Sequence, residues 1–162
     1  MELKGNPNLD GWSISRELFA WIKDKLPLGA TILEFGSGNG TKELAKFYNV
    51  ISIEHNKEWI GVAEGSEYHH APKVDGWYNK QVVEKAIKGR SIKAIIVDGP
   101  PGTGHRNGII DFLTENNRLL DSFIIIDDTN RKKEKRLANK IASIVQRKAI
   151  HIDGHEKSFD VI

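Results

Sequence analysis

Short runs of apolar, largely β-branched residues recur along the chain and alternate with segments of helical periodicity. Four of these runs predict buried strands, at residues 31–35, 50–54, 92–97 and 123–126. A near-continuous apolar run is what a strand needs when helices cover both faces of its sheet. A shorter strand is predicted near residues 68–70, in the part of the chain where the pattern is weakest.

The segments between these strands carry apolar residues every three or four positions, which predicts helices packed against a sheet. The predicted helices cover residues 41–48, 56–63, 81–87, 109–120 and 131–148, and an opening helix ends near Pro27. Strands that alternate with helices are typical of a doubly wound, Rossmann-like α/β fold with a mostly parallel sheet.

The C-terminal residues break this alternation. Two short runs, at residues 148–152 and 157–162, are separated by Asp153-Gly154. Asp-Gly between such runs favours a tight turn, so the tail predicts an antiparallel C-terminal hairpin at the sheet edge. We therefore predict one domain over residues 1–162, in which residues 1–28 form an N-terminal helical segment.

The composition narrows the class of protein. Hydrophobic residues make up 39% and charged residues 28% of the chain, as in ordinary globular domains. The chain has no cysteine, which excludes disulfides and thiolate metal sites, and its net charge of +2 is too mild to indicate nucleic acid. No apolar run approaches the ~20 residues that span a bilayer, and the N-terminus lacks the apolar core of a secretion signal. We expect a cytoplasmic enzyme or binding domain, with no membrane and no nucleic acid among its partners.

The strongest local signal is a glycine-rich turn, Glu34-Phe-Gly-Ser-Gly-Asn-Gly-Thr41, which follows the first predicted strand and opens a helix. Glycines permit a tight turn and let bare backbone approach a ligand. The dinucleotide fingerprint has glycine at its first, third and sixth positions, whereas the sixth position here is Thr41. Glu54 ends the second predicted strand, where an acid can accept two hydrogen bonds from ribose hydroxyls.

This glycine spacing, with an acid two residues before the first glycine, resembles motif I of class I methyltransferases. The resemblance implies that the turn holds the amino acid part of S-adenosylmethionine. The predicted cofactor-binding residues are Glu34, Phe35, Gly36, Ser37, Gly38, Gly40, Thr41, Glu54 and His55. A generic tight turn, an S-adenosylmethionine-binding protein without catalysis and an NAD-binding oxidoreductase domain are the alternatives, and Thr41 speaks against the last of these.

Carboxylates follow two further predicted strands, at Asp98 and at Asp127-Asp128. In open α/β sheets ligands bind beyond the carboxyl ends of the strands, and three carboxylates there would repel one another unless a cation lay among them. Magnesium, manganese and calcium ions prefer such oxygen ligands. An equally good interpretation is that Asp127 or Asp128 caps a helix while Asp98 fixes the loop that follows it.

The acidic arrangement is similar to that of metal-dependent O-methyltransferases of the catechol type, which implies that Asp98, Asp127 and Asp128 bind a divalent cation. A second resemblance, over roughly residues 30–130, is to glucuronoxylan-type polysaccharide O-methyltransferases, on the loop Asp98-Gly-Pro-Pro-Gly and the following Arg106. Together they imply a metal-assisted O-methyltransferase whose partner is a small-molecule or saccharide acceptor.

The loop after Asp98 supplies the candidate catalytic residues. His105 is a candidate base for the proton of the acceptor, because imidazole titrates near neutral pH. Arg106 is a candidate clamp for an anionic group, and Asp98 is the third member of this set. A solvent-facing histidine and an arginine paired with a surface acid are the alternatives. The short chain leaves little room for a substrate lid, so a homo-oligomer is a further expectation.

Overall fold

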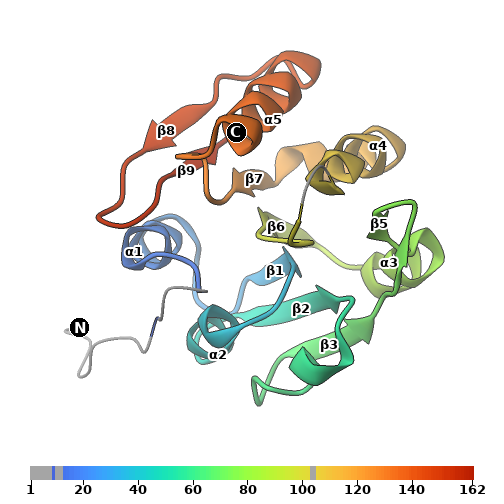
Figure 1. Ribbon diagram of the computed structural model, residues 1–162. Helices are drawn as coiled ribbons and strands as arrows, with labels where there is room; N and C mark the ends of the chain where they lie inside the picture. The colour runs from blue at the N-terminus through green and yellow to red at the C-terminus, as the bar shows by residue number, and fades with distance from the viewer. Residues whose placement is uncertain (1–8, 10–12, 103–104) are drawn as a thin grey trace.

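The computed structural model describes residue 9, residues 13–102 and residues 105–162. Its centre is a seven-stranded sheet with the order β3-β2-β1-β6-β7-β9-β8 (Figure 1). The strands from β3 to β7 in this order are parallel, whereas β9 is antiparallel to both of its neighbours. The strands are β1 Thr31–Phe35, β2 Asn49–Glu54, β3 Glu67–His70, β6 Ile92–Val97, β7 Phe123–Ile126, β8 Ile150–Ile152 and β9 Phe159–Val161.

Helices cover both faces of this sheet, as the continuous apolar strands predicted. The helices are α1 Arg16–Lys25, α2 Asn39–Ala45, α3 Lys80–Ile87, α4 Gly108–Glu115 and α5 Lys132–Ile144. Residues of α1 and α2 share one buried core with Ala94 and Ile96 of β6, while residues of α3, α4 and α5 share the other with Ile95 and Val97. Successive residues of one strand therefore pack against opposite helical layers, which confirms the predicted α/β class. Among the described residues, no helix is long and apolar enough to cross a membrane.

Two predicted helices differ from the observed elements. The helix expected at residues 56–63 is one turn of 3₁₀ helix, η1 Lys57–Trp59. The helix expected at residues 109–120 ends at Glu115, and a 3₁₀ helix, η3 Asn117–Asp121, follows. The side chain of the capping residue Asn116 donates a hydrogen bond to the carbonyl oxygen of Phe112 at 3.0 Å. Side-chain bonds of this kind compete with helical backbone bonds, so the chain turns there.

The segment before α3 forms a small two-stranded sheet that the sequence pattern did not predict, β4 Lys73–Val74 and β5 Trp77–Tyr78. Its turn contains Asp75 and Gly76, which both have positive φ angles, of 50° and 82°. The aromatic rings of β5 pack on Phe35 at the end of β1, with ring centroids 5.0 and 5.5 Å apart. Tertiary packing therefore stabilises a segment whose local sequence pattern does not indicate a strand.

The C-terminal hairpin forms at the edge of the sheet, as predicted. The final strand β9 lies between β7 and β8, so the edge strand of the sheet is β8. All three residues of β9 are buried, whereas two of the three residues of β8 are exposed. Because β9 runs against β7, it begins at the edge where the parallel strands end. The loop before β9 therefore reaches the carboxyl ends of the parallel strands.

Candidate functional site

The glycine turn after β1 lies against the loop after β6. Gly36 has a φ of 93°, a conformation that side chains disfavour, and its N–H donates to the carbonyl oxygen of Ile53 at 3.0 Å. A Cβ atom at Gly36 would lie 3.1 Å from the backbone nitrogen of Gly99. Only glycine fits here without displacing one of the two backbones. Because Gly36 has no side chain, the ends of β1 and β6 can lie close together.

Glu54 fixes the end of β2 against the same turn. One oxygen, Oε2, accepts the N–H of Ser37 at 2.9 Å, and the other, Oε1, accepts the N–H of Asn56 at 2.7 Å. His55 Nδ1 lies 3.0 Å from Oε1, and only 4% of the Glu54 side chain is exposed. The backbone thus holds the carboxylate in one orientation at the end of the strand.

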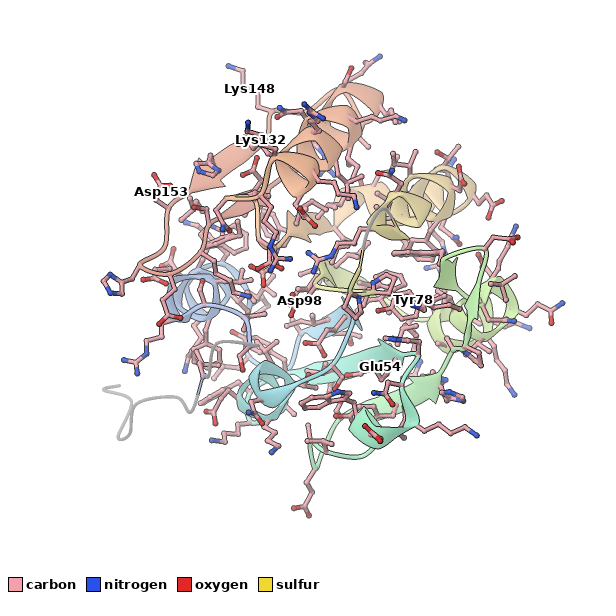
Figure 2. The ribbon with its side chains drawn as sticks, viewed as in Figure 1. Glu54, Tyr78, Asp98, Lys132, Lys148 and Asp153 are labelled. Atoms are coloured by element: carbon pink, nitrogen blue, oxygen red, sulfur yellow. The ribbon has the colours of Figure 1, made fainter. Side chains whose placement is uncertain are left out.

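These groups line a cavity of about 640 Å³ at the carboxyl ends of the parallel strands. Its size falls in the range of small-molecule and cofactor sites. Figure 2 shows Glu54, Tyr78 and Asp98 around the middle of the molecule, where this cavity lies. The predicted residues in its lining are Gly36, Ser37, Gly38, Glu54, His55, Asp98, Arg106 and Asp128.

Four predicted cofactor-binding residues lie behind the cavity lining rather than in it: Glu34, Phe35, Gly40 and Thr41. The Glu34 carboxylate is buried and accepts hydrogen bonds from Thr41 Oγ1 at 2.8 Å and Ser52 Oγ at 3.1 Å. Burial raises the pKa of Glu34 to about 7. Thr41 Oγ1 in turn accepts the N–H of Gly38 at 3.0 Å. Glu34 and Thr41 therefore brace the turn from behind.

Several lining residues were not among the predicted site residues. They include Asn39, Asn56, Trp59, Tyr78, Pro100, Arg131, Glu134 and Lys157. Tyr78 is 2% exposed, and its hydroxyl has no hydrogen-bond partner among the described residues. The hydroxyl lies against Gly99, where a Cβ atom would overlap it. A hydroxyl of this kind in a cavity wall is free to bond a ligand or a water molecule in the cavity.

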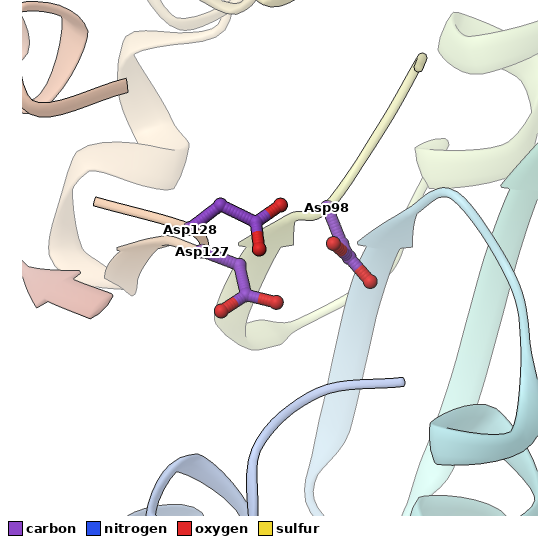
Figure 3. Close-up of side chains that lie close together, drawn as sticks. All are labelled: Asp98, Asp127 and Asp128. Atoms are coloured by element: carbon purple, nitrogen blue, oxygen red, sulfur yellow. The ribbon is translucent and has the colours of Figure 1, made fainter. Parts of the chain in front are cut away.

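The three predicted metal-binding carboxylates do come together. Asp98, Asp127 and Asp128 each offer an oxygen atom within 4.8 Å of the others, at the ends of β6 and β7 (Figure 3). Burial raises the pKa of Asp98 well above its ordinary value, and the negative charge of Asp127 adds to this. Burial also acts to raise the pKa of Asp128, but the charges of nearby cations outweigh it and lower that pKa.

Two cationic side chains lie among these carboxylates. Lys157 Nζ is 2.6 Å from Asp127 Oδ2 and 3.4 Å from Asp128 Oδ1. Arg106 Nη2 is 3.1 Å from Asp128 Oδ2 and 3.7 Å from Asp98 Oδ1. The repulsion that argued for a metal ion is therefore offset by the protein itself. Arg106, predicted as a clamp for an anionic acceptor, is engaged with acids of its own chain.

Arg106 also bonds the backbone of both strand ends. It donates to the carbonyl oxygen of Asp98 at 2.9 Å and to that of Asp127 at 3.2 Å. Asp128 has a φ of 61°, which is uncommon outside glycine and typical of functional or turn positions. The side chain of His105, the predicted base, lies outside the described part of the structure.

Comparison with known proteins supports the fold alone. No protein-family model and no curated protein match the sequence. A solved structure titled "Human methyltransferase 10 domain containing protein" superposes with a TM-score of 0.54, at 11% identity, over 90% of this chain and 78% of that chain. The fold is that of class I methyltransferases. The comparison lends no support to the finer resemblances, to catechol-type and glucuronoxylan-type enzymes, and these remain predictions.

A second solved structure, a complex of Mtq2 and Trm112 from E. cuniculi, matches with a TM-score of 0.45 and 15% identity, over 89% of this chain and 88% of that chain. Its title describes methylation of the translation termination factor eRF1, so that methyltransferase has a protein partner and a protein substrate. The sequence predicted a small-molecule or saccharide acceptor and no nucleic acid. That prediction of partners conflicts with the protein partner and the protein substrate that this title names.

Proposed function

We propose that the protein is an S-adenosylmethionine-dependent methyltransferase whose cofactor binds in the cavity between the glycine turn, Glu54 and the loop after β6. The observation that carries this proposal is the convergence of three features on one cavity. They are the bare backbone at Gly36 and Gly38, the fixed carboxylate of Glu54 and the unpartnered hydroxyl of Tyr78.

The residues present fit the chemistry of this cofactor. Glu54 has acceptor capacity left after its two backbone hydrogen bonds, because a carboxylate has about four acceptor positions, and it would hold the ribose hydroxyls. The glycines leave room for a ligand directly on the turn. Tyr78 would donate its hydroxyl to a ligand oxygen or nitrogen. S-adenosylmethionine, when bound, supplies a methyl group on a positively charged sulfur.

The acceptor would enter beside the acidic and basic side chains at the ends of β6 and β7. We assign proton uptake from the acceptor hydroxyl or amine to Asp98, because this carboxyl group lines the cavity and burial raises its pKa, which makes it a stronger base than an ordinary aspartate. Arg106 orients Asp98 and Asp128 through its four contacts with them and with Asp127. A metal-assisted form of the reaction has less support, since Lys157 and Arg106 already lie among the carboxylates.

Calorimetric titration with S-adenosylhomocysteine tests the cofactor assignment. Glu54→Gln removes the charge of the ribose-binding group, and hydrogen bonds to a charged group contribute about 1.5–3 kcal/mol, so affinity should fall about 10- to 100-fold. Glu58→Gln, in the exposed turn after β2, removes the same charge nearby and should leave affinity unchanged. Equal affinity in Glu54→Gln and wild type would refute the ribose assignment, and competition by NAD would favour the oxidoreductase alternative.

A further inference from the structure

We propose that Lys157 is the resident cation of this site, and that its ammonium group takes the place among Asp98, Asp127 and Asp128 that a divalent metal ion would otherwise take. The proposal rests on the proposed function for its chemical meaning, since it concerns the acceptor side of the same cavity. It predicts a methyltransferase site that works without a bound metal.

The first argument is steric. A divalent ion bound to carboxylate oxygens lies about 2.0–2.6 Å from them. Lys157 Nζ lies 2.6 Å from Asp127 Oδ2 and reaches Asp128 Oδ1 at 3.4 Å. An ion that bridged these two oxygens would overlap the ammonium group, so the two cations exclude each other.

The second argument is the balance of charge. Three carboxylates form the cluster, and three cationic side chains contact them: Lys157, Arg106 and Arg131, whose Nη1 lies 3.4 Å from Asp128 Oδ2. Buried charges are stable only when they are paired and hydrogen-bonded. These side chains already supply positive charge next to the acids, so the protein needs no divalent ion to offset the repulsion between the carboxylates.

The third argument is that the backbone places Lys157 firmly. Its neighbour Ser158 accepts the N–H of Thr129 at 2.8 Å through its carbonyl oxygen, directly after Asp127 and Asp128. Only 15% of the Lys157 side chain is exposed, and it lines the cavity. The start of β9 is thus tied to the end of β7, which holds the ammonium group over the acids.

In this position Lys157 acts as a positioning residue for the acceptor side. It fixes the carboxyl group of Asp127 and places a positive charge beside Asp98, where negative charge develops as an acceptor loses its proton. Asp127 Oδ1 is buried and has no hydrogen-bond partner among the described residues. Removing Lys157 would therefore leave the Asp127 carboxylate without a partner, beside the oxygens of Asp98 and Asp128. Such a set of oxygen atoms is what a hard divalent ion prefers.

Manganese binding to the full chain, followed by electron paramagnetic resonance and calorimetry, tests the proposal. We expect wild type and Lys157→Arg, which keeps the charge, to show no saturable binding of manganese chloride in the micromolar range. We expect Lys157→Ala and Lys157→Met to gain one manganese site, with affinity raised about 10- to 100-fold, the range by which groups around metal ligands commonly change affinity. Adding Asp127→Ala to Lys157→Met should abolish that site.

Two results would overturn the proposal. One is micromolar binding of a single manganese ion to wild type, which needs no variant to measure. The other is a folded Lys157→Met protein that binds manganese no better than wild type does. Titration with S-adenosylhomocysteine in the same preparations separates this proposal from the proposed function. A wild-type protein that binds neither manganese nor S-adenosylhomocysteine contradicts the proposed function. A wild-type protein that binds manganese at micromolar concentration and also binds S-adenosylhomocysteine contradicts only the role of Lys157.

Discussion

Replacing Glu34 by glutamine tests whether this residue braces the glycine turn or contacts the cofactor. The folded state raises the pKa of Glu34 from 4.5 to about 7, mainly through burial, so the native protein binds this proton more tightly than the unfolded chain does. The stability that the proton provides is present below pH 4.5 and is lost as pH rises toward the folded pKa. A shift of this size corresponds to about 3 kcal/mol at pH values well above 7, and to about 2 kcal/mol between pH 5.5 and 8.

Glu34→Gln removes this titration while keeping an oxygen that can accept hydrogen bonds from Thr41 and Ser52. Urea unfolding of wild type and variant at pH 5.5 and pH 8 measures the effect. We expect the stability advantage of the variant to grow by about 2 kcal/mol between the two pH values. The contributions of all other titrating groups to the pH dependence of unfolding cancel in this comparison, because both proteins contain the same groups.

The same pair of proteins tests the placement of Glu34. Because Glu34 lies behind the cavity lining, the variant should bind S-adenosylhomocysteine with the affinity of wild type at pH 6, where most of the wild-type carboxyl is neutral. A parallel pH dependence of unfolding in both proteins would refute the buried, proton-binding state. A loss of affinity of tenfold or more would instead support the direct contact with the cofactor that the sequence predicted.

Three further substitutions probe the walls of the site. Tyr78→Phe removes a hydroxyl that has no partner among the described residues, so the free energy of unfolding should stay the same or rise by about 1 kcal/mol. The affinity for S-adenosylhomocysteine should fall about fivefold, and an unchanged affinity would show that the hydroxyl does not contact the ligand. Gly36→Ala forces a residue with a side chain into a left-handed conformation beside Gly99, so the free energy of unfolding should fall by about 1–2 kcal/mol and the cofactor affinity should fall as well. An unchanged melting temperature would contradict this. Gly108→Ala places a Cβ atom in the ring of Trp77, so tryptophan fluorescence should shift and stability fall by about 1–3 kcal/mol, and an unchanged emission spectrum would argue against that contact.

The parallel part of the sheet was predictable because each strand is buried on both faces and so appears as a continuous apolar run. The glycine turn was predictable for a similar reason, since Gly36 occupies a backbone conformation that few other residues adopt. The acids at the strand ends follow from topology: parallel neighbours finish at the same edge. The confirmed features are thus those that local pattern and strand direction determine together.

The remaining features depend on contacts between distant segments. Lys157 is 30 residues from its partner Asp127 along the chain, and the insertion of β9 between β7 and β8 is what joins them. Tyr78 lines the cavity because its small hairpin packs on Phe35, and nothing in its local pattern indicates a strand. The sequence indicated that the acids would repel one another without a cation, but the side chain that supplies the positive charge depends on the order of the strands.

The position of β9 also has a consequence for how the chain assembles during synthesis. Among the described strands, β8 pairs only with β9, and β9 lies between β7 and β8. The edge of β7 therefore stays uncovered until β9 has left the ribosome. Until then Ile124, Ile125 and Ile126 form an open strand edge, and such edges recruit other chains. A nascent protein stalled before residue 159 should therefore be prone to aggregation and a natural client of chaperones that shield apolar strands.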